Sequence, residues 1–345
     1  MNSWKKNTKF IVLGLFVWHA SMIGHHSSFS LSSPLMAKEN KFYSDITPIY
    51  IALSVQWEGN HLKNHNLKTL EKIKEVIPGF TINHFVSPAY FLKPGIDPIK
   101  IREIIRKKIR PIDEVGLHLS SWKSILTAAK VSLNMSEETF WGGNLNELNC
   151  NQDCGDSVAL SSYSKDDITK IISISLKTLE DNSFSKIKSY IVKGWMSSEN
   201  ILNTAANLGL KYDFSPIALH LIRKRIYNYP IYEKLAGIWP HISPYSQPYN
   251  TQTESNKEVT QIAGGAAMVD YMSLSEIEVL FNSYLARKAA NPNHPLVFHL
   301  GMYQETANQY GPKFISAIKR ILATASKHRV NIRPLKLNQA IVQPR

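Results

Sequence analysis

IYIALSVQWE, residues 49–58, gives the clearest indication of the fold. The run is apolar and rich in β-branched and aromatic residues, which is typical of a buried strand. Side chains of a strand alternate between two faces. One face carries Ile51, Leu53, Val55 and Trp57. The other carries Tyr50, Ala52, Ser54, Gln56 and Glu58, and becomes polar at its carboxyl end. This pattern indicates the interior of a β/α barrel near its mouth; the alternative is an edge strand that ends in solvent.

Two later stretches repeat this polar ending. Residues 113–120, DEVGLHLS, place Glu114, Gly116, His118 and Ser120 on one face. Residues 295–302 predict another strand, and His299, Gly301 and Tyr303 share one of its faces. A single polar strand end more often meets solvent. The coincidence of three such ends favours a functional site.

Strand-like and helix-like segments alternate about six or seven times after residue 48. Helical spacing of apolar residues predicts helices over 66–77, 97–109, 164–181, 197–209, 273–289 and 312–328. Further strands are expected over 81–91 and 186–196. This order predicts a parallel sheet, open or closed into a barrel. We expect one domain over residues 38–345, an α/β fold with a distorted or incomplete β/α barrel, and insertions near 121–163 and 218–257.

The first 37 residues predict export. Lysines precede the apolar stretch 10–24, and small and polar residues follow up to Ala37. This is the order of a secretory signal peptide, and an uncleaved anchor is the alternative. The protein is therefore expected in the periplasm or outside the cell, with no integral membrane span after removal of the signal. In that setting Cys150 and Cys154 are expected to form a disulfide.

The chain of 345 residues has a formal net charge of +13, which favours anionic partners. Its densest basic run, 102–110, has isoleucines at helical spacing and indicates a solvated helix face. No nucleic-acid-binding motif is present, so nucleic acid is not expected as a partner.

Four short segments resemble, in order, motifs of the polysaccharide deacetylase family of carbohydrate esterases. They are SVQWEG (54–59), EVGLHLSSW (114–122), KSYIVKGWMSSENIL (188–202) and YQETA (303–307). The first is similar to a variant motif that reads Asp-Trp-Glu-Gly. The resemblance implies a barrel of polysaccharide-deacetylase type and metal-dependent hydrolysis of N-acetyl groups. Zinc, held by an acid and two histidines, would activate water in such a site.

The same resemblance assigns roles and shows departures from the family pattern. Glu58 resembles the acidic metal ligand and His118 the first histidine ligand. The position of the catalytic base holds Gln56, which cannot accept a proton at neutral pH. The second histidine ligand is replaced by Trp122 or Ser120, and the arginine that orients the base is replaced by Ile191. The late histidine acid is either displaced to His299 or replaced by Tyr303. Zinc is therefore expected to bind weakly or not at all, because two protein ligands hold it poorly.

Other side chains are candidates for contact with substrate. Trp122 and Trp195 follow strands that lead to the expected mouth, where their rings could stack on a sugar, although packing is the simpler role of each. Asp213, Asp270 or Glu305 could replace the missing base.

We expect a deacetylase-like protein that acts on or binds an N-acetylated glycan of the cell envelope, peptidoglycan or exopolysaccharide, with a degraded metal-hydrolase site. The alternatives are a catalytically silent relative that binds glycan or a partner, and a glycosidase on the same barrel.

Overall fold

The computed structural model describes residues 47–142, 153–262 and 267–337. The predicted signal peptide and Cys150 lie outside these ranges, so export and the Cys150–Cys154 disulfide stay predictions. Within the described residues, ten strands form one sheet. They are β1 (Ile49–Trp57), β2 (Ile82–Val86), β3 (Glu114–Leu119), β4 (Ser189–Val192), β5 (Tyr212–Asp213), β6 (Tyr249–Gln252), β7 (Glu258–Gln261), β8 (Ala267–Met268), β9 (Leu296–Tyr303) and β10 (Ile332–Pro334).

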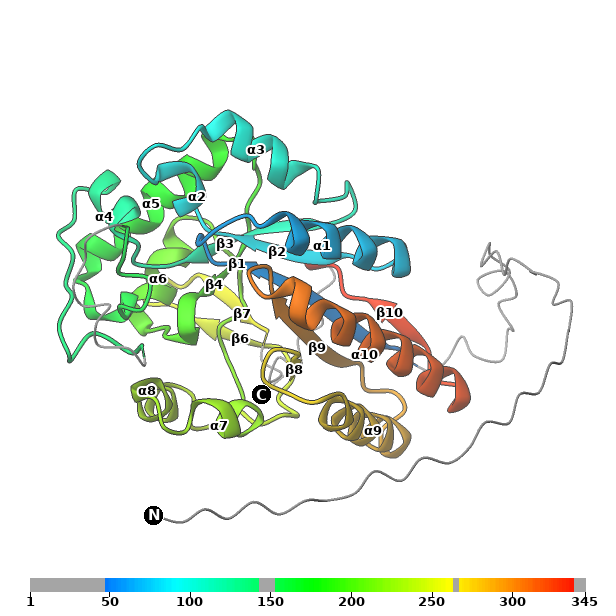
Figure 1. Cartoon of the computed structure of the whole chain (residues 1–345). Helices are drawn as coiled ribbons and strands as arrows, with labels where there is room; N and C mark the ends of the chain where they lie inside the picture. The colour runs from blue at the N-terminus through cyan, green and yellow to red at the C-terminus, as the bar shows by residue number, and fades with distance from the viewer. Residues whose placement is uncertain (1–46, 143–152, 263–266, 338–345) are drawn as a thin grey trace, which may run out of the picture. The chain divides into compact units, whose positions relative to one another are not determined.

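The sheet is a curled, incomplete barrel. Its strand order is β6-β7-β5-β4-β3-β2-β1-β9-β8, and β10 also pairs with the first half of β1. Neighbouring strands are parallel, except for the antiparallel pair β6 and β7. The two outermost strands, β6 and β8, are not paired with each other, so the described sheet stays open (Figure 1). The predicted distorted or incomplete β/α barrel is confirmed.

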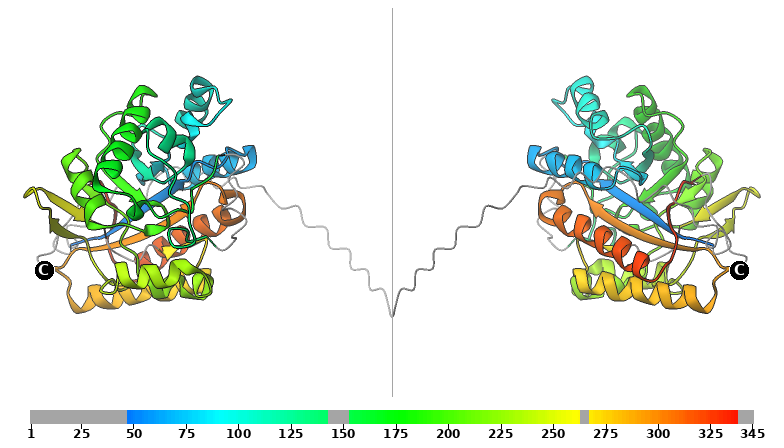
Figure 2. Two further views of the ribbon diagram at one scale, coloured as in Figure 1. Left: turned by 90° about the vertical axis from the view of Figure 1, so that its left-hand side faces the viewer. Right: turned by 90° about the vertical axis from the view of Figure 1, so that its right-hand side faces the viewer.

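Helices follow the strands, and most of them cover the outer face of the sheet. They are α1 (Asn64–Val76), α2 (Ala89–Leu92), α3 (Pro98–Arg106), α4 (Lys123–Ala128), α5 (Lys165–Asp181), α6 (Glu199–Asn207), α7 (Leu219–Ile226), α8 (Pro230–Ile238), α9 (Leu274–Ala290) and α10 (Ala307–Lys327), with short 3₁₀ turns η3 (Leu160–Ser162) and η4 (Lys193–Trp195). Helix α10 lies between α1 and α9, as both views of Figure 2 show. No helix of the described segments is long and apolar enough to cross a membrane.

The alternation of side chains along β1 follows the predicted parity. Ile51, Leu53 and Val55 join the large core between the sheet and its outer helices. On the opposite face, the Oγ of Ser54 lies 2.8 Å from the Nε2 of His299 on β9, inside the curl of the sheet. A second apolar cluster fills this inner side and includes Phe85, Ile191 and Phe214 together with residues of α7 and α8.

Local signals set several helix starts. The Asp97 carboxylate accepts hydrogen bonds from the backbone N–H groups of Ile99 and Lys100 at the start of α3. Ser164 caps α5 in the same manner, and Ser273 forms a reciprocal capping box with Glu276 at the start of α9.

Three predicted boundaries are wrong. The strand expected over 81–91 ends at Val86, and Pro88, whose fixed φ suits a helix start, precedes α2. The strand expected over 186–196 is limited to β4, because Gly194 has a φ of 62° and turns the chain into η4. The last helix begins at Ala307 and not at 312, with Pro312 in its second turn.

Candidate functional site

A buried ion-pair cluster lies where the first and fourth strands end. The Nζ of Lys193 lies 2.8 Å from Oε1 of Glu58 and 3.3 Å from Oδ2 of Asp156. The Lys193 side chain is only 7% exposed. Burial lowers the pKa of Lys193, but the charges of Glu58 and Asp156 outweigh burial, and the pKa is raised overall. Lys193 is therefore a fixed ammonium ion at neutral pH.

A tight turn places Lys193 in this cluster. Directly after β4 ends at Val192, Gly194 and Trp195 both adopt positive φ angles, 62° and 59°. A Cβ atom at Gly194 would lie 3.1 Å from the Trp141 ring. The turn therefore needs the small residue, and it directs the Lys193 side chain toward Glu58, which directly follows β1.

Glu305 is a further acid at this end of the sheet. Its Oε1 accepts hydrogen bonds from the backbone N–H of Glu58 at 3.0 Å and from the hydroxyl of Tyr90. Its Oε2 is buried without a hydrogen-bond partner among the described residues, as is Nε2 of Gln304. Burial, followed by the charge of Glu58, raises the pKa of Glu305 to about 8. Glu305 is thus mainly a neutral carboxylic acid at pH 7.

Asp270 is, after Glu305, the second acid at this end of the sheet with a raised pKa. Its Oδ2 accepts a hydrogen bond from the backbone N–H of Tyr303 at 3.2 Å, and its Oδ1 accepts one from the hydroxyl of Thr306. Burial raises the pKa of Asp270 to about 7, although these two hydrogen bonds act in the opposite direction. Perturbed acids that gather in this way are frequent at functional sites.

Three aromatic rings lie close together at the same end of the sheet. The ring centroids of Trp195 and Tyr271 are 5.9 Å apart, and those of Tyr271 and Tyr303 are 6.1 Å apart. The hydroxyls of the two tyrosines lie 3.4 Å from each other. Tyr271 is the partly exposed member, whereas Trp195 and Tyr303 are buried. The indole N–H of Trp195 has no hydrogen-bond partner within the described chain.

Gln56 and His118 are buried on the inner side of the sheet. Gln56 is opposite Tyr303 in the β1–β9 register, and its amide makes a weak contact of 3.8 Å with the sulfur of Met268. Neither ring nitrogen of His118 has a hydrogen-bond partner among the described residues. Burial, and then the charge of Lys193, holds the pKa of His118 well below its usual value. His118 is therefore a neutral imidazole near the ammonium of Lys193.

Trp122 binds the backbone of Glu58, a member of the ion-pair cluster. Its indole N–H donates to the carbonyl of Glu58 at 2.8 Å. The Nζ of Lys93 lies 3.8 Å from the centre of the Trp122 ring, a cation–π contact. Trp122 is 4% exposed, so it contributes to positioning Glu58 and presents little free surface for a ligand.

Two other predicted site residues, His299 and Asp213, have partners of their own away from the ion-pair cluster. His299 is opposite Ala52 in the register, four residues before Tyr303 on β9. Burial lowers the pKa of His299 to about 4, so its imidazole is neutral at pH 7. Asp213 is completely buried on β5, where it accepts hydrogen bonds from the backbone N–H of Ser215 and the amide of Gln261. Neither residue joins the cluster around Glu58 and Lys193.

The donor set does not fit a zinc ion. Glu58 forms an ion pair with the ammonium group of Lys193, and the charge of the same ammonium lowers the pKa of His118. Within residues 47–142, 153–262 and 267–337, no group of three or more His, Cys, Asp or Glu side chains could hold a metal ion. A dication beside Lys193 would also be repelled by its positive charge. No catalytic step is therefore assigned to a metal in this site.

Several residues of this site are not identified from the sequence alone. Lys193 and Tyr90 fall within predicted strands, and Asp156 falls in a predicted insertion without a motif. An ion pair between residues 135 positions apart, such as Lys193 and Glu58, leaves no local pattern. The available signal is the Lys-Gly dipeptide at 193–194, where a glycine after an apolar run indicates a turn.

We expect the Glu305→Gln variant to lose a pH dependence of stability. The raised pKa of Glu305 means that this carboxyl releases its proton on unfolding between about pH 4.5 and 8. Its contribution to stability is complete below its unfolded pKa and falls as pH rises toward 8, by at most about 1.4 kcal/mol per pH unit. Glutamine keeps the acceptor oxygen and cannot titrate, so stability relative to the parent should be higher at pH 8 than at pH 5.

Urea unfolding at several pH values measures this effect. Glu75→Gln, at an exposed position on α1, is the matched control and should leave the pH profile unchanged. Parallel profiles for the parent protein and Glu305→Gln would contradict the prediction.

Neither a family model nor a curated protein matches this sequence. Solved structures are similar in fold. A protein assigned as a polysaccharide deacetylase from Mycobacterium smegmatis is 11% identical, with 88% of this chain and 96% of that chain covered and a TM-score of 0.48. A family 4 carbohydrate esterase from Streptomyces lividans, in complex with acetate, is 8% identical, with 87% and 100% covered and a TM-score of 0.41.

A pseudoenzyme of the same esterase family from Bacillus anthracis is 8% identical, with 85% of this chain and 65% of that chain covered and a TM-score of 0.39. At these identities and TM-scores the likeness assigns no activity to this chain. The deacetylase-like arrangement of strands and helices is what these similarities describe.

Proposed function

We propose that this protein binds an N-acetylated glycan at the carboxyl ends of its strands and does not hydrolyse it. The observation that carries the proposal is the Lys193 ammonium 2.8 Å from Oε1 of Glu58. In this ion pair, Lys193 occupies the Glu58 carboxylate that would otherwise be the acidic ligand of a catalytic metal ion. Gln56 cannot act as a base. At these positions the chain therefore offers neither the free metal ligand nor the base that a metal-dependent deacetylase needs.

Polar and aromatic groups around the ion pair support a sugar as the ligand. Glu305 and Gln304 have buried polar atoms without partners in the described chain, and buried polar groups are normally satisfied by a partner, which a hydroxyl or acetamide group could provide. Tyr271 offers a partly exposed ring beside Trp195, and aromatic faces suit the apolar face of a sugar ring. The envelope glycans, peptidoglycan and exopolysaccharide, are the proposed sources of this sugar.

A glycosidase is the second candidate, favoured by one observation. Glu58 is held in an ion pair, whereas Glu305 has a pKa near 8. Two acids whose environments differ in this way are typical of acid and nucleophile roles in glycoside cleavage. Against this role, Oε1 of Glu305 already accepts hydrogen bonds from the hydroxyl of Tyr90 and from the backbone N–H of Glu58.

Calorimetric titration with an N-acetylglucosamine tetramer tests the proposed function. We expect measurable binding, weaker binding of the de-acetylated glucosamine tetramer, and about a fivefold loss of affinity in Tyr271→Ala. Tyr245→Ala is the matched control, because Tyr245 is also a partly buried tyrosine. It lies away from the proposed site, two residues before Gln247, whose side chain accepts a hydrogen bond from the backbone N–H of Val297 near the start of β9. Its affinity should stay within about twofold of the parent.

Assays of the same samples with added zinc separate the functions. We expect neither acetate nor new reducing ends to be released. Stoichiometric zinc binding together with acetate release would overturn the proposal that the protein does not hydrolyse its glycan. Release of reducing ends would establish a glycosidase activity. The absence of binding to any acetylated oligosaccharide would overturn the glycan assignment.

A further inference from the structure

A second concave site lies at the other end of the parallel strands. This cavity of about 800 Å³ is lined by the residues that begin β3, β4 and β5, together with the end of α3 and the segments that follow α5 and β10. Glu114, Ser189 and Tyr212, the first residues of those three strands, are among its lining residues. The cluster around Glu58 and Lys193 lies at the carboxyl ends of the strands, so the two sites are separate.

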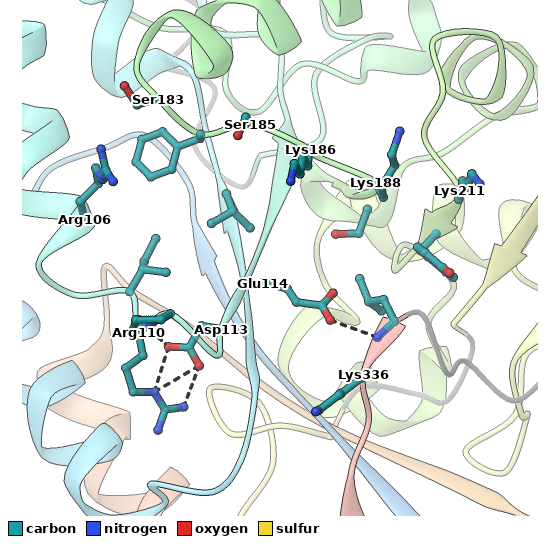
Figure 3. A pocket seen from close by; sticks show the side chains of 17 residues that line it. Arg106, Arg110, Asp113, Glu114, Ser183, Ser185, Lys186, Lys188, Lys211 and Lys336 are labelled. Carbon is teal, nitrogen blue, oxygen red and sulfur yellow. Dashed lines mark hydrogen bonds and ion pairs between the residues drawn. The ribbon is translucent and has the colours of Figure 1, made fainter.

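The lining of this cavity is strongly basic. Its six cations, shown in Figure 3, come from four separate segments of the chain: Arg106, Arg110, Lys186, Lys188, Lys211 and Lys336. Arg110 is paired with Asp113, whose Oδ1 lies 2.7 Å from its Nη2. None of the other five takes part in an ion pair with another described residue. Unpaired like charges around a concavity create a positive potential that attracts anions.

Glu114 is the other acid of the cavity, and one carboxylate cannot balance the five cations that form no ion pair. Its Oε1 accepts a hydrogen bond from the backbone N–H of Leu337 at 3.2 Å, as Figure 3 shows. Burial raises the pKa of Glu114, which reduces the negative charge that it carries at a given pH. The cavity therefore keeps an excess of positive charge.

The remaining lining provides hydroxyl groups. Ser183, Ser185 and Ser189 line the cavity, and the buried Oγ of Ser189 has no hydrogen-bond partner among the described residues. The loop between α5 and β4 carries two left-handed residues, Ser183 with a φ of 66° and Lys186 with a φ of 63°. Such conformations are costly for residues other than glycine and persist where the surrounding structure fixes them.

We propose that this cavity binds a compact anion that carries at least two phosphate or carboxylate groups. The lysines act as point charges for these groups, and the serine hydroxyls donate hydrogen bonds to them. The volume of the cavity suits a small ligand. Nucleic acid fits less well, because stacking of bases needs exposed aromatic rings, whereas Phe184 is buried and Tyr212 is only partly exposed.

Titration calorimetry of the whole protein at low salt tests the proposal with inorganic tripolyphosphate and with trigalacturonate. The pocket variant is Lys186→Gln/Lys188→Gln. The matched control is Lys319→Gln/Lys327→Gln on α10, which removes the same charge from two exposed lysines. We expect about a tenfold loss of affinity in the pocket variant and less than about a twofold loss in the control. The better ligand of the two shows whether phosphate or carboxylate is the preferred group.

Glu114→Gln provides a test of opposite sign, because loss of a negative charge should tighten binding by about threefold. Absence of binding to both anions, or equal losses in the pocket and control variants, would overturn the proposal. A short DNA duplex that binds more tightly than tripolyphosphate and loses affinity in the pocket variant would replace the compact anion by nucleic acid. None of these outcomes depends on glycan binding at the opposite end of the strands.

Discussion

The Lys193→Met variant should lose about 3 kcal/mol of its free energy of unfolding. The substitution keeps the length of the side chain and removes the ammonium that lies between Glu58 and Asp156. The Glu58 and Asp156 side chains are only 18% and 23% exposed, so two carboxylates would be left close together with little solvent. Urea unfolding followed by circular dichroism measures the loss.

An exposed lysine provides the matched control for this substitution. The Nζ of Lys165 lies 2.6 Å from Oε2 of Glu254, but both side chains are about half exposed, 49% and 54%. Exposed pairs contribute little, so Lys165→Met should cost less than about 1 kcal/mol. Adding Glu58→Gln to Lys193→Met should restore part of the lost stability, because it removes one of the two uncompensated charges. Equal losses for Lys193→Met and Lys165→Met would contradict the importance of the buried cluster.

The same variant also tests the proposed function. If the Lys193 ammonium excludes a dication from the site, then its removal should raise the affinity for zinc, since Glu58 and the neutral His118 would be free to bind. Calorimetric titration of folded Lys193→Met with zinc measures this change. Unchanged zinc affinity would show that the ammonium is not what opposes a metal at this site.

The second large effect is expected for Gly59→Ala, which should lower stability by about 2–4 kcal/mol. Gly59 directly follows Glu58 and has a φ of 93°, in the left-handed region that favours glycine. A Cβ atom there would lie 2.8 Å from Oγ of Ser87 and 3.0 Å from Nε1 of Trp122. Nε1 of Trp122 is the atom that donates to the Glu58 carbonyl, so the added Cβ would also disturb the position of Glu58 in the candidate site.

Gly79→Ala is the matched control for this change. A Cβ atom at Gly79 would have no neighbouring atom within 4 Å, and the φ of Gly79 is not positive. Alanine there should change stability by less than about 1 kcal/mol, in either direction. Thermal or urea unfolding of both variants makes the comparison, and a tolerated Gly59→Ala would contradict the role assigned to this turn.

The parallel strands β1, β3 and β9 and the faces of their side chains follow from the sequence alone. Period-two alternation correctly separates Leu53 and Val55, which pack against the outer helices, from Ser54 on the inner side. Local capping groups such as Ser164 and Ser273 fix helix starts within a residue or two. These features depend on near neighbours in the chain, and for that reason a pattern of residues is enough to predict them.

The depth of each polar side chain and the identity of its partners depend on the tertiary structure. Parity places His299 and Tyr303 on one face, but the register with β1 puts His299 opposite Ala52 and Tyr303 opposite Gln56, at the carboxyl end. The partner of Glu58 likewise depends on the turn after β4, which brings Lys193 to it across 135 residues. Pairing and register arise from how strands assemble, and no local periodicity encodes them.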